Sequence, residues 1–235
     1  QPVTCHTLFT NLFINDIDQG DGTCVRMPMD AHNATDPVND LDSRDMACGH
    51  NGAQGVPLIC PVPANSKLSF QFRSTPDASL PGVIDTSHLG PCAVYMKNVG
   101  SAIKESGVGD GWFKTGYWGY NSTTKKWCTE TLIEEKGKLS VDIPANLAGG
   151  YYLVRPEILA LQDPDKEPPN PQFYVGCAQI FLNSNGTTLP KYTVKIPGCV
   201  GVGDPGVRFD VYKPVGPMLR LGRRFIEWEL VRGGR

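Results

Sequence analysis

Two of the four histidines stand where a transition metal could be bound. His6 begins an apolar, strand-like run that extends to Ile14, and His88 lies in a loop sequence just before another predicted strand. In a chain that began at His6, this residue would offer two ligands, its α-amine and a ring nitrogen. A second imidazole would then complete a T-shaped set of three nitrogens, which suits copper. A lone loop histidine is more often solvated or capping, so the residues alone leave both interpretations open.

Gln172 and Tyr174 are two residues apart in a predicted strand. Side chains alternate between the faces of a strand, so these two should point to the same side. A tyrosine hydroxyl could fill the axial position of a copper bound by the histidines. We therefore expect both side chains to lie near His88.

Other catalytic patterns are missing from the sequence. Carboxylates for a hydrolase are plentiful, among them Asp85, Glu130, Glu157 and Asp163, but none lies in a diagnostic arrangement. No nucleophile elbow, HExxH helix or P-loop is present. The net charge of −2 gives no electrostatic reason to expect nucleic acid or an anionic membrane as partner. No apolar run approaches the roughly 18 residues of a transmembrane helix.

The elements that must position these residues are short strands separated by turns. Glycine (26) and proline (20) are so frequent among the 235 residues that a helical bundle or coiled coil is excluded. Glu130–Lys136 is the best short-helix candidate. The sequence has no internal repeat or linker and predicts an antiparallel β-sandwich with long loops and short helices. Strands are predicted at 6–14, 66–72, 92–97, 139–143, 151–155, 173–181, 192–196 and 207–212.

Eight widely spaced cysteines, without a CxxC pair, favour long-range disulfides in an oxidising compartment. Three sequons, at Asn33, Asn121 and Asn185, agree with secretion and are candidate glycosylation sites. Residues 1–5 are interpreted as the remnant of a signal sequence cut before His6, or as an ordinary extension. Residues 218–235 carry five of the 22 basic residues and form an atypical tail, either a short amphipathic helix or an irregular segment.

A set of motifs in fixed order resembles one enzyme family across 6–217. The chain is similar to the fungal lytic polysaccharide monooxygenases of auxiliary-activity family nine, formerly glycoside hydrolase family sixty-one. Any one motif would be weak evidence, but their order is specific. The motifs are His6-Thr-Leu-Phe, Asp18-Gln-Gly-Asp-Gly22, Ser43-Arg-Asp-Met-Ala-Cys48, Ser87-His-Leu-Gly-Pro91, Leu153-Val-Arg-Pro-Glu-Ile158, Pro171-Gln-Phe-Tyr-Val-Gly-Cys-Ala-Gln179, Asp204-Pro-Gly206 and Val215-Gly-Pro217.

The resemblance implies an immunoglobulin-like sandwich with a flat copper face. It assigns one copper to His6 and His88 with Tyr174 axial, and makes Gln172 the group that hydrogen-bonds oxygen species. It pairs Cys48 with Cys177 and leaves the partners of the other cysteines open. By family analogy Tyr212 holds the sugar chain, although it could equally belong to the core.

The reaction implied is oxidative cleavage of cellulose or a related β-1,4-glucan at C1 or C4. It would use O₂ or H₂O₂ and an external electron donor, such as a small phenol or cellobiose dehydrogenase. The expected protein is a secreted, extracellular monomer without nucleic-acid or membrane partners.

Three departures from the family pattern matter. His6 is not the first residue, so copper binding requires that maturation expose it. Gln162 stands where many relatives have a histidine, and an amide can hydrogen-bond but cannot act as an acid near neutral pH. The residues after Pro217 do not resemble the family's ending. The alternative functions are a family-like carbohydrate-binding protein without oxidative activity and, less well supported, an ordinary endoglucanase.

Overall fold

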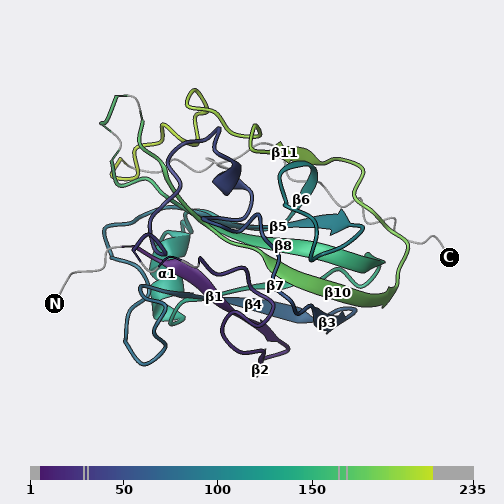
Figure 1. Cartoon of the computed structure of the whole chain (residues 1–235). Coiled ribbons are helices and arrows are strands. Elements are labelled where there is room, and N and C mark those ends of the chain that lie inside the picture. Colours follow the sequence, from purple (N-terminus) through teal and green to yellow (C-terminus); the bar gives the residue numbers. More distant parts are fainter. Residues whose placement is uncertain (1–5, 29, 31, 164, 168, 214–235) are drawn as a thin grey trace.

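The computed structural model describes residues 6–28, 30, 32–163, 165–167 and 169–213, and its strands form two sheets (Figure 1). The predicted N-terminal remnant, the Val215-Gly-Pro217 motif and the tail 218–235 lie outside the described residues. The elements are β1 (Leu8–Ile14), β2 (Ile17–Asp18), η1 (Arg44–Met46), β3 (Cys60–Pro63), β4 (Lys67–Arg73), β5 (Cys92–Val99), β6 (Gly109–Trp118), α1 (Cys128–Glu134), β7 (Lys138–Asp142), β8 (Ala148–Ala160), β9 (Gln172–Val175), β10 (Ala178–Asn185) and β11 (Val194–Ile196).

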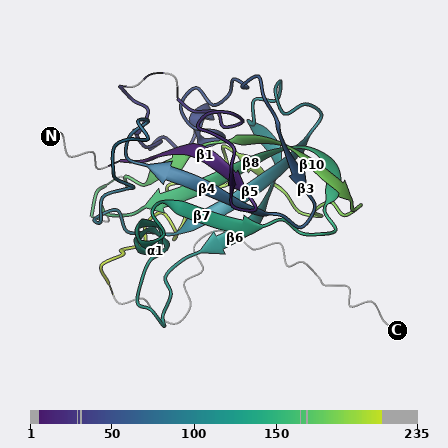
Figure 2. The same ribbon diagram turned by 90° about the horizontal axis from the view of Figure 1, so that it is seen from below.

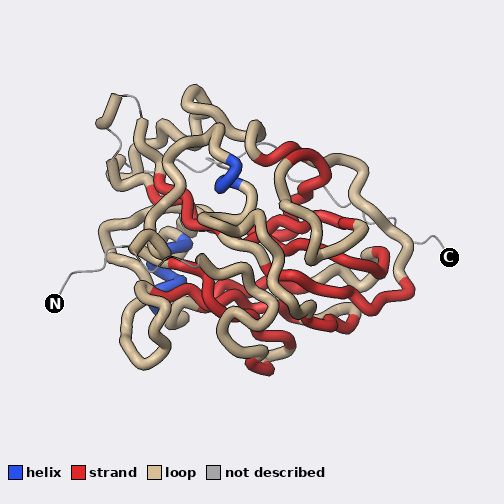
Figure 3. The backbone as a smooth tube through the Cα atoms, in the orientation of Figure 1, coloured by secondary structure: helices blue, strands red, loops and turns tan. Residues whose placement is uncertain are grey.

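The two sheets pack as a β-sandwich, as the sequence predicts. The smaller has the order β2-β1-β4-β7, and the larger has the order β11-β6-β5-β8-β10-β3, with β9 paired to β8. The pairs between these strands are antiparallel except that of β3 with β10, which is parallel. Figure 2 gives the second view of the two layers, and in Figure 3 loops dominate the end of the sandwich where β1 begins.

The larger sheet is covered on both faces. Val94 and Met96 of β5 belong to the core between the sheets, with Phe70 and Phe72 of β4. Their neighbour Tyr95 belongs to a second cluster on the opposite face. Because side chains alternate along a strand, burial on both sides explains why the first six residues of β5 are all buried. Residues of the covering loops and of η1 complete the second cluster on its outer side. They are Val38, Leu41, Met46, Val207 and Val211.

Arg155 fixes one of these covering loops. Its side chain is fully buried on β8, and Nε and Nη2 donate to the Met46 carbonyl at 3.0 and 2.8 Å. Nη1 pairs with Glu157 Oε2 at 2.6 Å. A buried charge needs such partners, so this arginine holds η1 against the sheet.

Two strand predictions were wrong. The predicted strand 173–181 is interrupted at Gly176 and Cys177, which separate β9 from β10. A Cβ on Gly176 would lie 3.1 Å from Phe9, so the chain there runs close against β1. The predicted strand 207–212 is a series of turns, in which Asp210 accepts a hydrogen bond from the Tyr212 amide.

Several boundaries also differ from the prediction. Helix α1 begins at Cys128 rather than Glu130, and β11 is confined to Val194–Ile196. Strand β6 was missed because Gly109, Gly111 and Gly116 break the apolar alternation that identifies strands.

Six of the described cysteines form disulfides. Cys48 bonds to Cys177 as the resemblance implied, Cys24 bonds to Cys60, and Cys92 bonds to Cys128. Among the described cysteines Cys199 is unpaired. The first bond joins residues 129 apart, whereas each of the others joins residues 36 apart.

We expect the Cys48–Cys177 disulfide to stabilise the fold most, because it closes the longest loop. On the chain-entropy model a loop of this length contributes about 5 kcal/mol and a 36-residue loop about 4 kcal/mol. Urea unfolding of a Cys48→Ala/Cys177→Ala variant should therefore show the larger loss of unfolding free energy. The matched control is Cys24→Ala/Cys60→Ala, and an equal or larger loss in that control would contradict the expectation.

Candidate metal centre

Three rings from distant parts of the sequence meet at one end of the sandwich. The ring centroids of His6 and His88 are 6.0 Å apart, those of His6 and Tyr174 are 5.9 Å apart, and those of His88 and Tyr174 are 6.0 Å apart. The histidine rings are nearly perpendicular, at 72°. The three therefore form an almost equilateral triangle, with two imidazoles and one phenol around a shared space.

The loop that carries His88 is fixed before β5 begins. Gly90 exchanges hydrogen bonds with Thr129 at the start of α1, and the Leu161 amide donates to the Leu89 carbonyl at 2.9 Å. A Cβ at Gly90 would lie 1.8 Å from the Leu159 carbonyl oxygen, so only glycine permits this approach. The sharp preceding turn is closed by a hydrogen bond from the His88 amide to the Asp85 carbonyl.

Tyr174 and Gln172 point to the same side of β9. The Tyr174 hydroxyl donates to Gln172 Oε1 at 2.7 Å, a contact that requires both side chains on one face. Gln172 also lies near His88: burial lowers the pKa of that imidazole, and Gln172 partly opposes the lowering. The structure thus places Gln172, Tyr174 and His88 together, as the spacing of the first two residues and the family resemblance led us to expect.

Asp36 is a neighbour of the centre that sequence reasoning missed. Its Oδ1 lies 3.3 Å from Nδ1 of His6, which is about one-third exposed. Asp36 directly follows the Asn33 sequon, and nothing in its spacing links it to His6. The contact arises from the packing of the 33–38 loop, in which Val38 pairs with Phe173 of β9.

The residues present fit a copper ion. Nε2 of His88 is buried and makes no hydrogen bond, which is costly for a polar atom unless another ligand satisfies it. Imidazole nitrogens are good copper ligands, and a phenol oxygen suits a weak axial position. Within the described part of the chain no group of three His, Cys, Asp or Glu could hold a metal. In a chain that began at His6, the α-amine of that residue would be available as a third nitrogen beside the two imidazoles.

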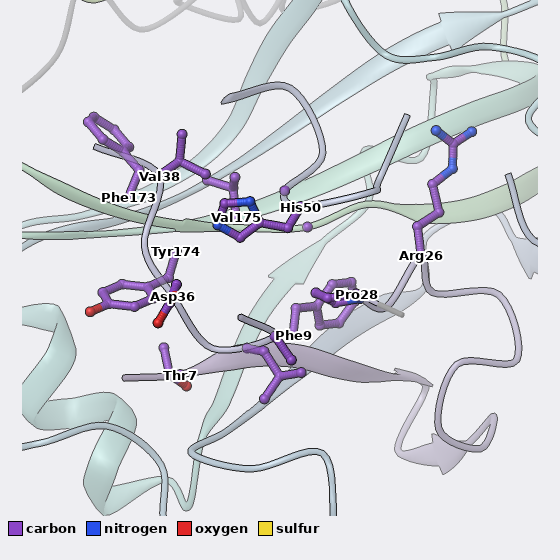
Figure 4. Close-up of a pocket in the computed structure, with 14 residues that line it drawn as sticks. Thr7, Phe9, Arg26, Pro28, Asp36, Val38, His50, Phe173, Tyr174 and Val175 are labelled. Atoms are coloured by element: carbon purple, nitrogen blue, oxygen red, sulfur yellow. The ribbon is translucent and has the colours of Figure 1, made fainter. Parts of the chain in front are cut away.

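A cavity of about 20 Å³ lies behind the centre, enough for one water molecule (Figure 4). Tyr174, Asp36 and Thr7 lie close together at one end of the view. His50 also lines the cavity, and its Nδ1 lies 2.9 Å from Oδ2 of Asp45.

Gln162 and Tyr212 are neighbours in space. The Tyr212 hydroxyl donates to the Gln162 carbonyl at 3.3 Å, and the tyrosine is 60% exposed. Oε1 of Gln162 is buried without a hydrogen-bond partner. Gln162 directly follows Leu161, which is bonded to the His88 loop, so it lies on the same side as the centre.

The three sequon asparagines differ in accessibility. Asn121 and Asn185 are exposed, the first in a turn and the second at the end of β10, whereas Asn33 is half-buried. Oδ1 of Asn121 accepts hydrogen bonds from the amides of Thr123 and Thr124, which leaves its nitrogen side available.

The fold and the sequence together define a family of lytic polysaccharide monooxygenases. Residues 6–217 match the sequence model of "Auxiliary Activity family 9 (formerly GH61)". The chain is 58% identical over 214 residues to AA9 family lytic polysaccharide monooxygenase H of Botryotinia fuckeliana, covering 91% of this chain and 49% of that one. It is 50% identical over 210 residues to monooxygenase C of Aspergillus tamarii, covering 88% and 56%.

Solved structures agree with these relatives. CvAA9A superposes with a TM-score of 0.80 at 29% identity, over 93% of this chain and 100% of that chain. A cellulose-active polysaccharide monooxygenase from M. thermophila superposes with a TM-score of 0.70 at 25% identity, over 92% and 100%.

This chain therefore belongs to Auxiliary Activity family 9. It spans about half the length of the relatives from B. fuckeliana and A. tamarii. In the part of the chain that the structure describes, no helix has the length and apolar character needed to cross a membrane.

His88 should titrate below its ordinary value in the metal-free protein. Burial lowers its pKa from 6.5, repulsion from His6 lowers it further, and Asp85 opposes both effects. The folded chain then binds fewer protons than the unfolded chain, so stability should fall as the pH drops through about 6.5. NMR titration of the imidazole C–H signals measures the pKa directly. In His6→Ala the pKa of His88 should rise but stay below 6.5, and an unchanged value would contradict the arrangement.

Proposed function

We propose that this chain is a secreted, copper-dependent monooxygenase that cleaves β-1,4-glucan by oxidation at C1 or C4. The observation that carries the proposal is the triangle of His6, His88 and Tyr174, with a buried nitrogen on His88 that lacks a hydrogen bond. Bound copper supplies the one-electron chemistry that activates O₂ or H₂O₂ and allows hydrogen abstraction from an unactivated C–H bond. When O₂ is used, an external reductant, such as a small phenol or cellobiose dehydrogenase, supplies the electrons that the reaction requires.

His6 and His88 would hold the metal in this proposal, and Tyr174 would offer its phenol oxygen beside them. His88 is suited to a fixed position because it is only 5% exposed and its loop is bonded to α1 and the end of β8. Burial also keeps its imidazole neutral, which is the form that binds metal. His6 is more exposed, so it forms the side of the centre that faces solvent and substrate.

In this proposal the amides of Gln172 and Gln162 form hydrogen bonds with oxygen species beside the metal. The Tyr174 hydroxyl donates to Oε1 of Gln172 and so orients its amide, leaving the Nε2 hydrogens available to an oxygen species. Gln162 lies beside the His88 loop with an unsatisfied Oε1, which can accept a hydrogen bond. Because an amide does not titrate near neutral pH, Gln162 positions hydrogen bonds without supplying a proton.

Substrate contact is proposed on the face that carries Tyr212. Its ring is 60% exposed and is anchored through its hydroxyl to the Gln162 carbonyl, so it can stack on a sugar without moving. The structural neighbour from M. thermophila is described as cellulose-active, and cellulose is the substrate we propose here. Secretion and glycosylation, best at the exposed Asn121 and Asn185, are part of the same proposal.

Copper(II) should bind tightly only to chains that begin at His6. A free α-amine and Nδ1 of His6 form a chelate, whereas an amide nitrogen binds copper only after a costly deprotonation near neutral pH. Calorimetry and electron paramagnetic resonance should detect tight binding and an axial type-2 signal for the chain that starts at His6. The chain that starts at Gln1 should show neither.

Product analysis on cellulose with a reductant completes this test. The chain starting at His6 should release oxidised cello-oligosaccharides, and its His88→Ala variant serves as the matched control without the second imidazole. If both chain forms bind copper weakly and release no oxidised product, the alternative of a carbohydrate-binding protein without oxidative activity becomes the better account.

Replacing Gln162 by histidine should change oxidative turnover more than stability. The new imidazole would add an acid–base group beside the centre, where general acid–base catalysis typically contributes at least about 100-fold when it is used. Peroxide-driven cello-oligosaccharide release and thermal unfolding should be measured in parallel, with Gln162→Asn as the non-titrating control. Equal activity of wild type and Gln162→His would mean that this position is passive.

A further inference from the structure

A second cleft lies on the outer face of the smaller sheet, with a volume of about 620 Å³. This volume falls within the range of small-molecule sites. Its floor comes from β1 and β4, and its walls are the segments 18–21 and 78–83, with the end of α1 at one side. None of the proposed metal ligands lines it. In Figure 1 the floor strands β1 and β4 run beside the β1–β2 turn and α1.

Asn11 forms part of the floor and carries an unsatisfied acceptor. It is only 5% exposed, and its Nδ2 donates to Oδ1 of Asp18 at 2.6 Å. The hydrogen bond from Asn11 and a second one from the Gly20 amide lower the pKa of Asp18, which keeps this carboxylate ionised. Because a carboxylate can accept a hydrogen bond from the Nδ2 group of Asn11 but not from its Oδ1, the orientation of the Asn11 amide is fixed. Oδ1 of Asn11 is therefore the group left buried without a partner.

Arg73 supplies an unsatisfied donor in the same cleft. Its Nη2 is paired with Oδ2 of Asp21 in one wall, whereas its Nε is buried and makes no hydrogen bond. Asn11 and Arg73 lie on neighbouring antiparallel strands, and both line the cleft. A buried polar group that is left unpaired destabilises the fold, so two in one cleft indicate groups that a ligand satisfies.

The charges and the rim define the class of ligand. Asp18 and Asp21 are balanced by Arg73 and Lys136, so the lining favours neither a cation nor an anion. Leu80, at the rim, is 53% exposed and offers an apolar surface. A neutral molecule with neighbouring hydroxyls that both donate and accept, and with apolar C–H faces, matches this lining.

The wall that carries Leu80 is held in position by contacts with the end of β4. Gly82 has a φ of +128°, and a Cβ there would lie 2.1 Å from Oγ of Ser74. The Ser74 amide donates to the Gly82 carbonyl at 3.2 Å, which ties the wall to the end of β4. A cleft whose walls are held in this way loses little entropy when it binds a ligand.

We propose that this cleft binds a neutral carbohydrate, through a hydroxyl that donates to Asn11 Oδ1 and a hydroxyl that accepts from Arg73 Nε. The inference goes beyond the proposed function, since it requires neither copper nor the histidines. The cleft would give the chain a second glycan-binding site, which is not catalytic.

NMR titration of the ¹⁵N-labelled, metal-free protein tests the proposal. Cellohexaose, xylohexaose and mannohexaose are the probes, each added to about 10 mM so that weak binding is detected. With at least one of them, the Arg73 Nε–H signal and the Asn11 Nδ2 signals should shift and saturate. Arg73→Lys keeps the charge beside Asp21 but removes the Nε donor, and should weaken binding about tenfold.

Leu80→Ala keeps the test decisive if the arginine variant folds poorly. Leu80→Ala should also weaken binding. Leu58→Ala is a matched control at a leucine that is 57% exposed and outside the cleft, and this control should have no effect.

The proposal is wrong if no probe gives a saturable shift at Arg73 and Asn11, because the cleft then holds only water. It is equally wrong if neither Arg73→Lys nor Leu80→Ala weakens the binding. Copper binding by the Arg73→Lys chain that starts at His6 should be unchanged, which separates failure of this site from failure of the metal centre.

Discussion

The junction at Gly176 and Cys177 is the constraint on which the arrangement of the candidate centre depends. Cys177 is bonded to Cys48, and its carbonyl accepts a hydrogen bond from the Arg26 amide. A Cβ on Gly49 would lie 2.4 Å from the Val175 carbonyl oxygen, so the loop that carries Cys48 runs directly against the end of β9. Tyr174 comes three residues before the bonded cysteine. The disulfide therefore fixes the strand that presents Tyr174 and Gln172, and it does so by holding a distant loop against it.

Burial of both sheet faces extends this constraint to the rest of the molecule. A sandwich needs only one buried face per sheet, but here the larger sheet also carries a second apolar cluster beneath long loops. Arg155, which is fully buried, ties one of those loops to the sheet through the Met46 carbonyl. Buried contacts of this kind tie long loops to the sheet. His88 and Tyr212, to which we propose functional roles, both lie in such loops.

The candidate centre combines a buried and an accessible side. His88 is buried, has a pKa lowered by that burial and is fixed by its loop. His6 is partly exposed and lies beside Asp36. Such a division suits the metal centre and the polymeric substrate that we propose. The outer cleft differs in kind, because its paired charges and unsatisfied hydrogen-bonding groups suit a ligand that is bound without being transformed.

The sequence alone determined the elements whose signal is local. Alternation in 66–72 and 92–97 predicted β4 and β5, and the spacing of Gln172 and Tyr174 predicted their shared face, because side-chain direction along a strand has a period of two. The ordered motifs pointed to the family that the comparisons then established. Only the tertiary structure decided that Cys24 pairs with Cys60, that residues 207–212 form turns, and that Asp36 lies beside His6. These features depend on which loops pack together over long separations in the chain, and side-chain periodicity carries no information about such contacts.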